Sequence, residues 1–92
     1  GGEVIAAPKN KLLAQRIAQA IGRVLEIPAR RDGGLYPLAQ FKRERQFTPG
    51  FVRAGGLIVE VFFQSNPAEL GRYRGRFWLV ATAIADAVTA TP

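Results

Sequence analysis

The chain has 92 residues, of which 48% are hydrophobic and 22% charged, so it has room for one small folded domain and lacks the composition of a disordered segment. Cysteine and histidine are both absent, which excludes disulfides and thiolate chemistry and removes the usual general base at neutral pH and the commonest metal ligand. The formal net charge of +6 favours polyanionic partners, among them nucleic acid, phospholipid headgroups and the anionic polymers of bacterial walls.

The chain does not begin as a newly translated protein would. It opens with Gly1, Gly2 and Glu3 and contains no methionine, so we expect a processed product, a tagged protein or an excised segment. No stretch approaches the roughly 20 apolar residues that span a bilayer, and no signal peptide is visible. We therefore expect no membrane span, and a signal for export would lie upstream.

The first third of the chain predicts a strand, a helix and a turn. Residues 3–7 form a short predicted strand that Pro8 ends, because proline cannot continue a ladder. Asn10 is placed to cap a helix, which Pro28 would end. Within it, apolar residues recur at helical spacing, at Leu13, Ile17, Ile21 and Val24. The glycines and the aspartate of residues 29–34 predict a turn.

The middle of the chain predicts a strand, a loop and a second strand. Residues 35–41 would be irregular or at a sheet edge because of Pro37, and the arginine-rich residues 42–56, with their proline and glycines, predict a surface loop. Residues 57–63, LIVEVFF, carry the strongest strand signal, and Glu60 is their only polar residue. Such a run is typical of an interior strand covered on both faces, as in parallel α/β sheets.

The last third predicts helices. Asn66, Pro67 and Glu69 have the order of a helix start, and we expect a short helical turn to end near Gly71. Residues 77–89 keep a spacing of three to four and predict a closing helix, with a strand over 77–80 as the alternative. The elements together predict an α/β fold, a sheet with helices on both faces.

Glu60 is the residue whose predicted position is costly without a purpose. An isolated carboxylate between apolar layers either loses several kcal/mol of hydration or stays protonated. A glutamate held in that way can act as a general acid and base. The alternative is that Glu60 pairs with one of the arginines or lies at the open end of its strand.

Three other features have simpler explanations. Ser65 has no histidine to activate it, so a nucleophilic serine is not expected. Asn66 is interpreted as a helix cap. Residues 72–78, RYRGRFW, alternate arginines with aromatics as single-stranded nucleic-acid binders do, but on a helix they also fit a solvated arginine face over buried aromatics.

The residues around Glu60 resemble a known family. Residues 57–70, LIVEVFFQSNPAEL, are similar to the segment "LVEVGFLSNPEE-L" of the zinc-dependent N-acetylmuramoyl-L-alanine amidases. Residues 73–74 and 83–88 resemble that family's closing helix, and residues 3–4 with 10–17 resemble its "G-E-V-Y" strand and the helix after it. The departures are Phe62, which replaces a frequent glycine, the loop over 42–53 and the bulky pair at 77–78.

The resemblance implies that residues 1–92 are a single amidase-like domain or, as we expect, the C-terminal half of the catalytic domain. The family cleaves the amide between N-acetylmuramic acid and L-alanine, with zinc held by two histidines and a glutamate that lie upstream of this chain. Glu60 matches the family's general base. The implied partners are peptidoglycan and the remaining half of the domain, and the implied location is periplasmic, cell-wall or extracellular.

Two other functions stay open. One is a non-catalytic basic α+β module that binds nucleic acid or an anionic wall polymer. The other is a degenerate amidase-like domain kept for wall binding or regulation, which the missing histidines favour if these residues are the whole protein. Under the amidase interpretation, nucleic acid is not expected as a partner, and a bacterial autolysin and a phage endolysin are equally compatible.

Overall fold

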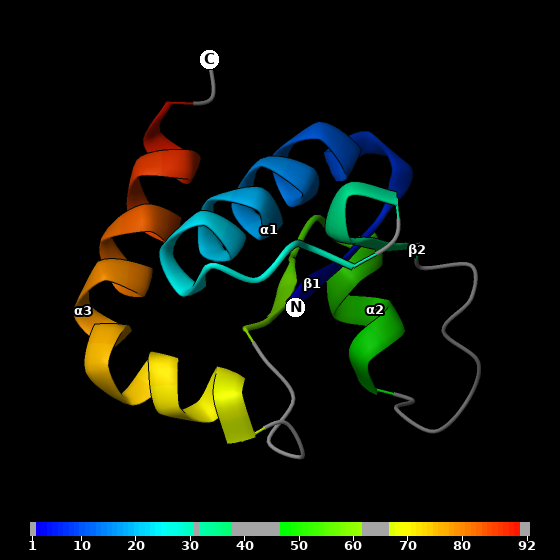
Figure 1. The fold of residues 1–92 in the computed structure, drawn as a ribbon. Coiled ribbons are helices and arrows are strands. Elements are labelled where there is room, and N and C mark those ends of the chain that lie inside the picture. The colour runs from blue at the N-terminus through cyan, green and yellow to red at the C-terminus, as the bar shows by residue number, and fades with distance from the viewer. Residues whose placement is uncertain (1, 31, 38–46, 62–66, 91–92) are drawn as a thin grey trace.

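The computed structural model describes residues 2–30, 32–37, 47–61 and 67–90. In these ranges a small sheet lies among helices (Figure 1). The elements in chain order are β1 Glu3–Ala6, the 3-10 turn η1 Pro8–Asn10, α1 Lys11–Leu25, the 3-10 turn η2 Asp32–Gly34, β2 Leu35–Pro37, α2 Phe47–Arg53, β3 Ile58–Glu60 and α3 Pro67–Thr89. None of the helices in these ranges is long and apolar enough to cross a membrane.

The sheet is mixed, with strand order β2-β1-β3. Strand β1 runs parallel to β2 and antiparallel to β3. The strand predicted over residues 57–63 is found as β3, Ile58–Glu60, but the interior position predicted for it is not observed. In the described part of the chain β3 has one neighbour and lies at the sheet edge, and residues 62–63 lie outside the description. Ile58 and Val61 are half-buried. The error arises because a run of apolar residues indicates that both faces of a strand are covered, but it does not indicate how many strands lie beside it in the sheet.

Helices cover both faces of the sheet, as the sequence predicted. Successive side chains of a strand point to opposite faces. On one face Val4 and Ala6 pack against the buried side of α1, at Ile17 and Ile21, and against α3. On the other face Ile5 and Ala7 pack against α2 at Val52. The fold class is α/β.

Helix α2 occupies part of the region predicted as a surface loop. Val52 is fully buried against Ile5, Tyr36 and Ile58. The polar composition of this segment does not predict such a tertiary contact. The helix ends through backbone bonds from Gly55 and Gly56 to the carbonyls of its last turn. Residues 42–46 of the predicted loop lie outside the described ranges.

Helix α1 begins where the sequence indicated but ends earlier. Asn10 holds the N-cap position, yet its side chain donates to the Gly55 carbonyl at 3.2 Å and makes no cap bond. Glu26 adopts a left-handed conformation, φ 59°, and stops the helix two residues before Pro28. Leu12, next to the apolar series that begins at Leu13, is 75% exposed.

Helix α3 consists of two helical segments that meet at Arg76, where φ is −134° and ψ is 17°. A start at Pro67 and a second helix over residues 77–89 were predicted, and the alternative strand over 77–80 is wrong. The helical turn predicted to end near Gly71 is longer than expected, because the first segment continues to the kink at Arg76. The first segment turns across the end of α1 and the second runs along its side (Figure 1).

Candidate active site

Glu60 is the last residue of β3 and lies directly opposite Glu3 of β1 in the antiparallel register. Residues opposite each other in such a pair have Cβ atoms about 4.5–5.5 Å apart and point to the same face. The next pair on this face is Ile5 with Ile58, which packs toward α2. The two carboxyl groups therefore emerge side by side at one end of the sheet, on its α2 face.

The burial of the two glutamates differs from the sequence-based expectation. Glu60 is half-buried at the end of its strand, so the premise of a carboxylate enclosed between apolar layers is wrong, and the alternative placement at an open strand end is correct. Glu3 is the buried member, with 7% of its surface exposed. Like charges directly opposite each other are destabilising in a sheet, which makes this pair a better functional candidate than either residue alone.

Sequence reasoning missed Glu3 as a site residue. Glu3 begins a predicted strand and the segment that resembles the family's G-E-V-Y strand, but neither pattern marks it as a site residue. The signal that could have found Glu3 is its place in a short strand whose other residues, VIA, are all apolar. Glu60 has a similar place, because it follows apolar residues in β3. Only the register of the two strands shows that Glu3 and Glu60 lie opposite each other.

Gly2 fixes the approach of β1 to the end of β3. A Cβ atom on Gly2 would lie 2.6 Å from the Val61 carbonyl oxygen and 2.7 Å from that of Glu60, distances that real Cβ atoms essentially never show. The Gly2 carbonyl in turn accepts a hydrogen bond from the Arg30 amide at 3.2 Å. The backbone that carries Glu60 is therefore held against a residue that must lack a side chain.

The described residues do not fit a zinc site. In the ranges that the structure covers, no three His, Cys, Asp or Glu side chains gather closely enough to hold a metal ion. The Glu3–Glu60 pair offers two carboxylates, whereas protein zinc sites use three or four protein ligands, mostly histidine and cysteine. Ser65 and Asn66 lie outside the described residues.

The arginine and aromatic cluster over residues 72–78 is arranged differently from both expectations. Arg76 donates to the Val24 carbonyl at 2.8 Å and to Glu26 Oε2 at 2.6 Å, and Arg72 donates to the carbonyls of Leu25 and Glu26 at 3.2 Å. These two arginines thus satisfy carbonyls that the end of α1 leaves unpaired. The Arg76 guanidinium also lowers the pKa of Glu26, by its hydrogen bond and its charge.

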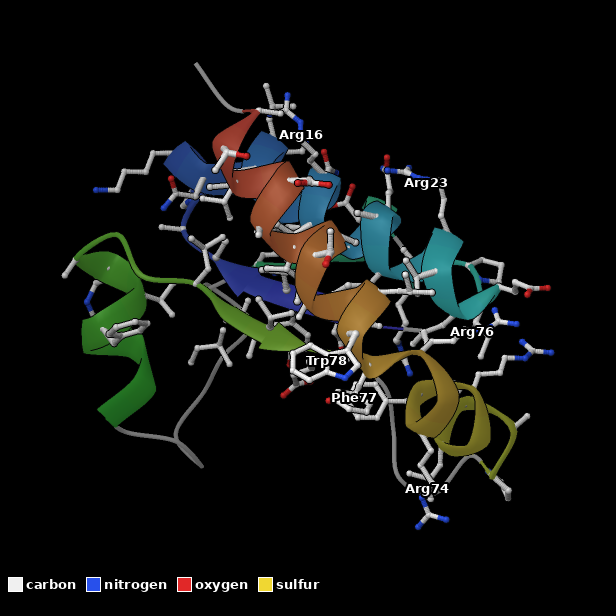
Figure 2. The ribbon with its side chains drawn as sticks, turned by 90° about the vertical axis from the view of Figure 1, so that its left-hand side faces the viewer. Arg16, Arg23, Arg74, Arg76, Phe77 and Trp78 are labelled. Carbon is white, nitrogen blue, oxygen red and sulfur yellow. The ribbon has the colours of Figure 1, made fainter. Side chains whose placement is uncertain are left out.

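Phe77 and Trp78 are exposed while Tyr73 is half-buried against the core, so the expected arginine face over buried aromatics is wrong for two of the three aromatics. Phe77 and Trp78 are 44% and 74% exposed, and their ring centroids lie 5.0 Å apart. In Figure 2 both rings lie in front of α3, while Arg76 points away from them toward the end of α1. With Arg72 and Arg76 engaged in the fold, the case for a nucleic-acid groove here is weakened.

A groove of about 410 Å³ between α1 and α3 is the second basic feature. Arg16 and Arg23, two helical turns apart on α1, lie along its rim, as Figure 2 also shows. Its walls are mostly alanine, and Asp86 faces it from α3. The groove suits a small anionic group, although Asp86 offsets part of the positive charge.

The sequence matches no protein-family model and no curated protein. Among solved structures, the fold is similar to the crystal structure of a candidate N-acetylmuramoyl-L-alanine amidase from Neisseria meningitidis, with a TM-score of 0.84 and 30% sequence identity. The match covers 98% of this chain and 48% of that protein. The chain folds like about half of that protein. It spans about half the length of the protein that it resembles, and the similarity extends over almost all of this chain.

Proposed function

We propose that this chain is the C-terminal half of an amidase catalytic domain that hydrolyses the bond between N-acetylmuramic acid and L-alanine in peptidoglycan. The observation that carries the proposal is the similarity to the Neisseria meningitidis protein over 98% of this chain at 30% identity. The resemblance of residues 57–70 to the amidase segment around the general base supports it independently of the fold.

The role we assign to Glu60 is that of the general base. Its carboxylate would take a proton from the attacking water and return it to the departing amine of L-alanine, so that the glutamate is unchanged after a turnover. A half-buried position at a strand end suits this role, because the group is open to water and its backbone is fixed by β1. Glu3, opposite it, supplies a second carboxylate on the same face.

The proposal requires zinc ligands outside this chain. The resemblance implies zinc bound by two histidines and a glutamate upstream, and the described residues offer no such set. The other members of the proposed assembly are peptidoglycan and the remaining half of the domain, in the periplasm, the cell wall or the extracellular space. A histidine-glycine pair, a glutamate and a further histidine preceding Gly1 in the parent polypeptide would support it, and a natural terminus at Gly1 would refute it.

The decisive experiment compares Glu60→Gln with Glu26→Gln in the complete zinc-loaded domain. Glutamine keeps the shape of the side chain but cannot accept a proton from water, so hydrolysis of purified peptidoglycan should fall about 10²–10⁴-fold for Glu60→Gln. Glu26→Gln removes the ion pair with Arg76 after the last turn of α1, so it should lower the melting temperature but leave the turnover of the folded enzyme unchanged. Zinc content and melting temperature are measured on the same preparations. Near-normal turnover in folded, zinc-loaded Glu60→Gln would remove Glu60 from the mechanism.

A non-catalytic basic module is the second candidate, and the net charge of +6 together with the arginine-lined groove favours it. In that case the chain alone should bind teichoic acid or another anionic wall polymer with an affinity that falls steeply as salt is added. The double variant with Arg16→Gln and Arg23→Gln should bind this polymer more weakly than the wild type. Binding that does not depend on salt, or no binding at all, would reject the basic-module function.

A further inference from the structure

The second segment of α3 has an outer face that is unlike a solvent-exposed helix surface. Residues 77–90, FWLVATAIADAVTA, include a single charged residue, Asp86. Phe77, Trp78 and Val88 are respectively 44%, 74% and 47% exposed. A surface helix normally carries charged or polar residues opposite its buried stripe, and a helix that is apolar all round is normally buried on all sides.

Most of the exposed apolar residues form one continuous stripe, and Leu79, 58% exposed, lies outside it. Phe77, Ala81, Ala85 and Val88 follow one another at spacings of four, four and three, which places them on one side of the helix, and Trp78 adjoins Ala81. We call these five residues the α3 stripe. Val80 and Ala87, on the other side, are buried toward α1. Figure 2 looks onto the outer side of α3, and Phe77 and Trp78 stand in front of the ribbon with no element over them.

Two further observations indicate what covers the stripe. The similar protein from Neisseria meningitidis contains about as much chain again as the part matched here, since the match spans 48% of it. In the described part of the chain the sheet also ends at β3, which has one hydrogen-bonded neighbour. In the described residues, one strand edge and one apolar helix face are thus both left without a covering element. Both are surfaces on which further polypeptide packs.

We propose that the α3 stripe is the surface on which a helix of the other half of the amidase domain packs, an inference that rests on the proposed function. The two alanines allow that helix to approach closely, and helices with small contact residues pack at the short end of the usual 8–10 Å interaxial range. Phe77, Trp78 and Val88 supply the bulk of the buried area at the two ends of the stripe. The uncharged stripe favours this occupant over a polyanion.

The test uses the fact that Trp78 is the only tryptophan of the chain. The part of the Neisseria meningitidis protein that this chain does not match is fused through a flexible linker to Gly1, which raises its effective concentration to about the millimolar range. Quenching of Trp78 fluorescence by iodide is compared between the fusion and the isolated chain. We expect strong quenching in the isolated chain and marked protection with a blue-shifted emission in the fusion.

Matched variants identify the surface. Val88→Arg, in the stripe, should restore quenching in the fusion. Leu12→Arg, at an aliphatic position on α1 that is 75% exposed against 47% for Val88, should not. Unprotected Trp78 in the fusion, or equal protection in both variants, overturns the proposal. So does a dimer of the isolated chain in analytical ultracentrifugation that Val88→Arg dissociates, because the occupant is then a second copy.

Peptidoglycan hydrolysis by the same fusion separates this inference from the function. Protection of Trp78 without hydrolysis would keep the docking surface and reject the amidase assignment. Hydrolysis with Trp78 still fully quenched would keep the amidase and reject the docking surface.

Discussion

Replacing Gly2 with alanine tests the geometry of the candidate site directly. The new Cβ atom would lie 2.6 Å from the Val61 carbonyl oxygen and 2.7 Å from the Glu60 carbonyl oxygen, while ordinary contacts begin at 3.4 Å. The end of β3 must therefore retreat by about 0.8 Å, and because both obstacles are backbone atoms, no side chain can rotate to absorb the change. Overpacking of this kind costs about 1–3 kcal/mol. In a domain of this size each kcal/mol lowers the melting temperature by about 4–8 °C.

The matched control is Gly71→Ala, in the first segment of α3, where no atom lies within 4 Å of the added Cβ. Alanine is favoured over glycine inside a helix by about 0.8–1.0 kcal/mol, so this variant should be slightly more stable than the wild type. Thermal unfolding is followed by circular dichroism, and hydrogen exchange reports the protection of the β1 and β3 amides. Wild-type stability and unchanged amide protection in Gly2→Ala would refute the close approach of Gly2 to Glu60.

Three further predictions concern zinc, the α1 terminus and α2. The isolated chain, which has neither histidine nor cysteine, should bind zinc no better than weakly, and stoichiometric micromolar binding in calorimetric titration would contradict this. Glu26→Gln should lower the melting temperature at neutral pH, and this effect should disappear on acidification. Arg76 lowers the pKa of Glu26 below its usual 4.5, so the ion pair stabilises the fold above that pH. The stabilisation is lost as the pH falls through the pKa of Glu26 in the folded state. Val52→Ala should cost about 1.5–3 kcal/mol in urea unfolding, and an unchanged midpoint would show that Val52 does not anchor α2.

The sequence alone determined the features that depend on near neighbours in the chain. The apolar period of α1, the strand over Glu3–Ala6 and the two-segment form of α3 follow from spacing and from the conformational limits of proline and glycine. Glu60 was also visible as a polar residue in an apolar run. Each of these signals lies within about one turn or one strand of the residue it concerns.

Tertiary structure alone decided the features that join residues far apart. Val52 makes a helix of a segment whose composition predicts a loop, because its contacts on β1 and β3 outweigh weak local propensity. The antiparallel register sets Glu3 opposite Glu60, and a shift by one residue would have turned either side chain to the other face. Arg76 reaches the carbonyls at the end of α1 across 52 positions of sequence. Periodicity carries no information about such contacts, because it describes which face of an element is buried and never which element covers it.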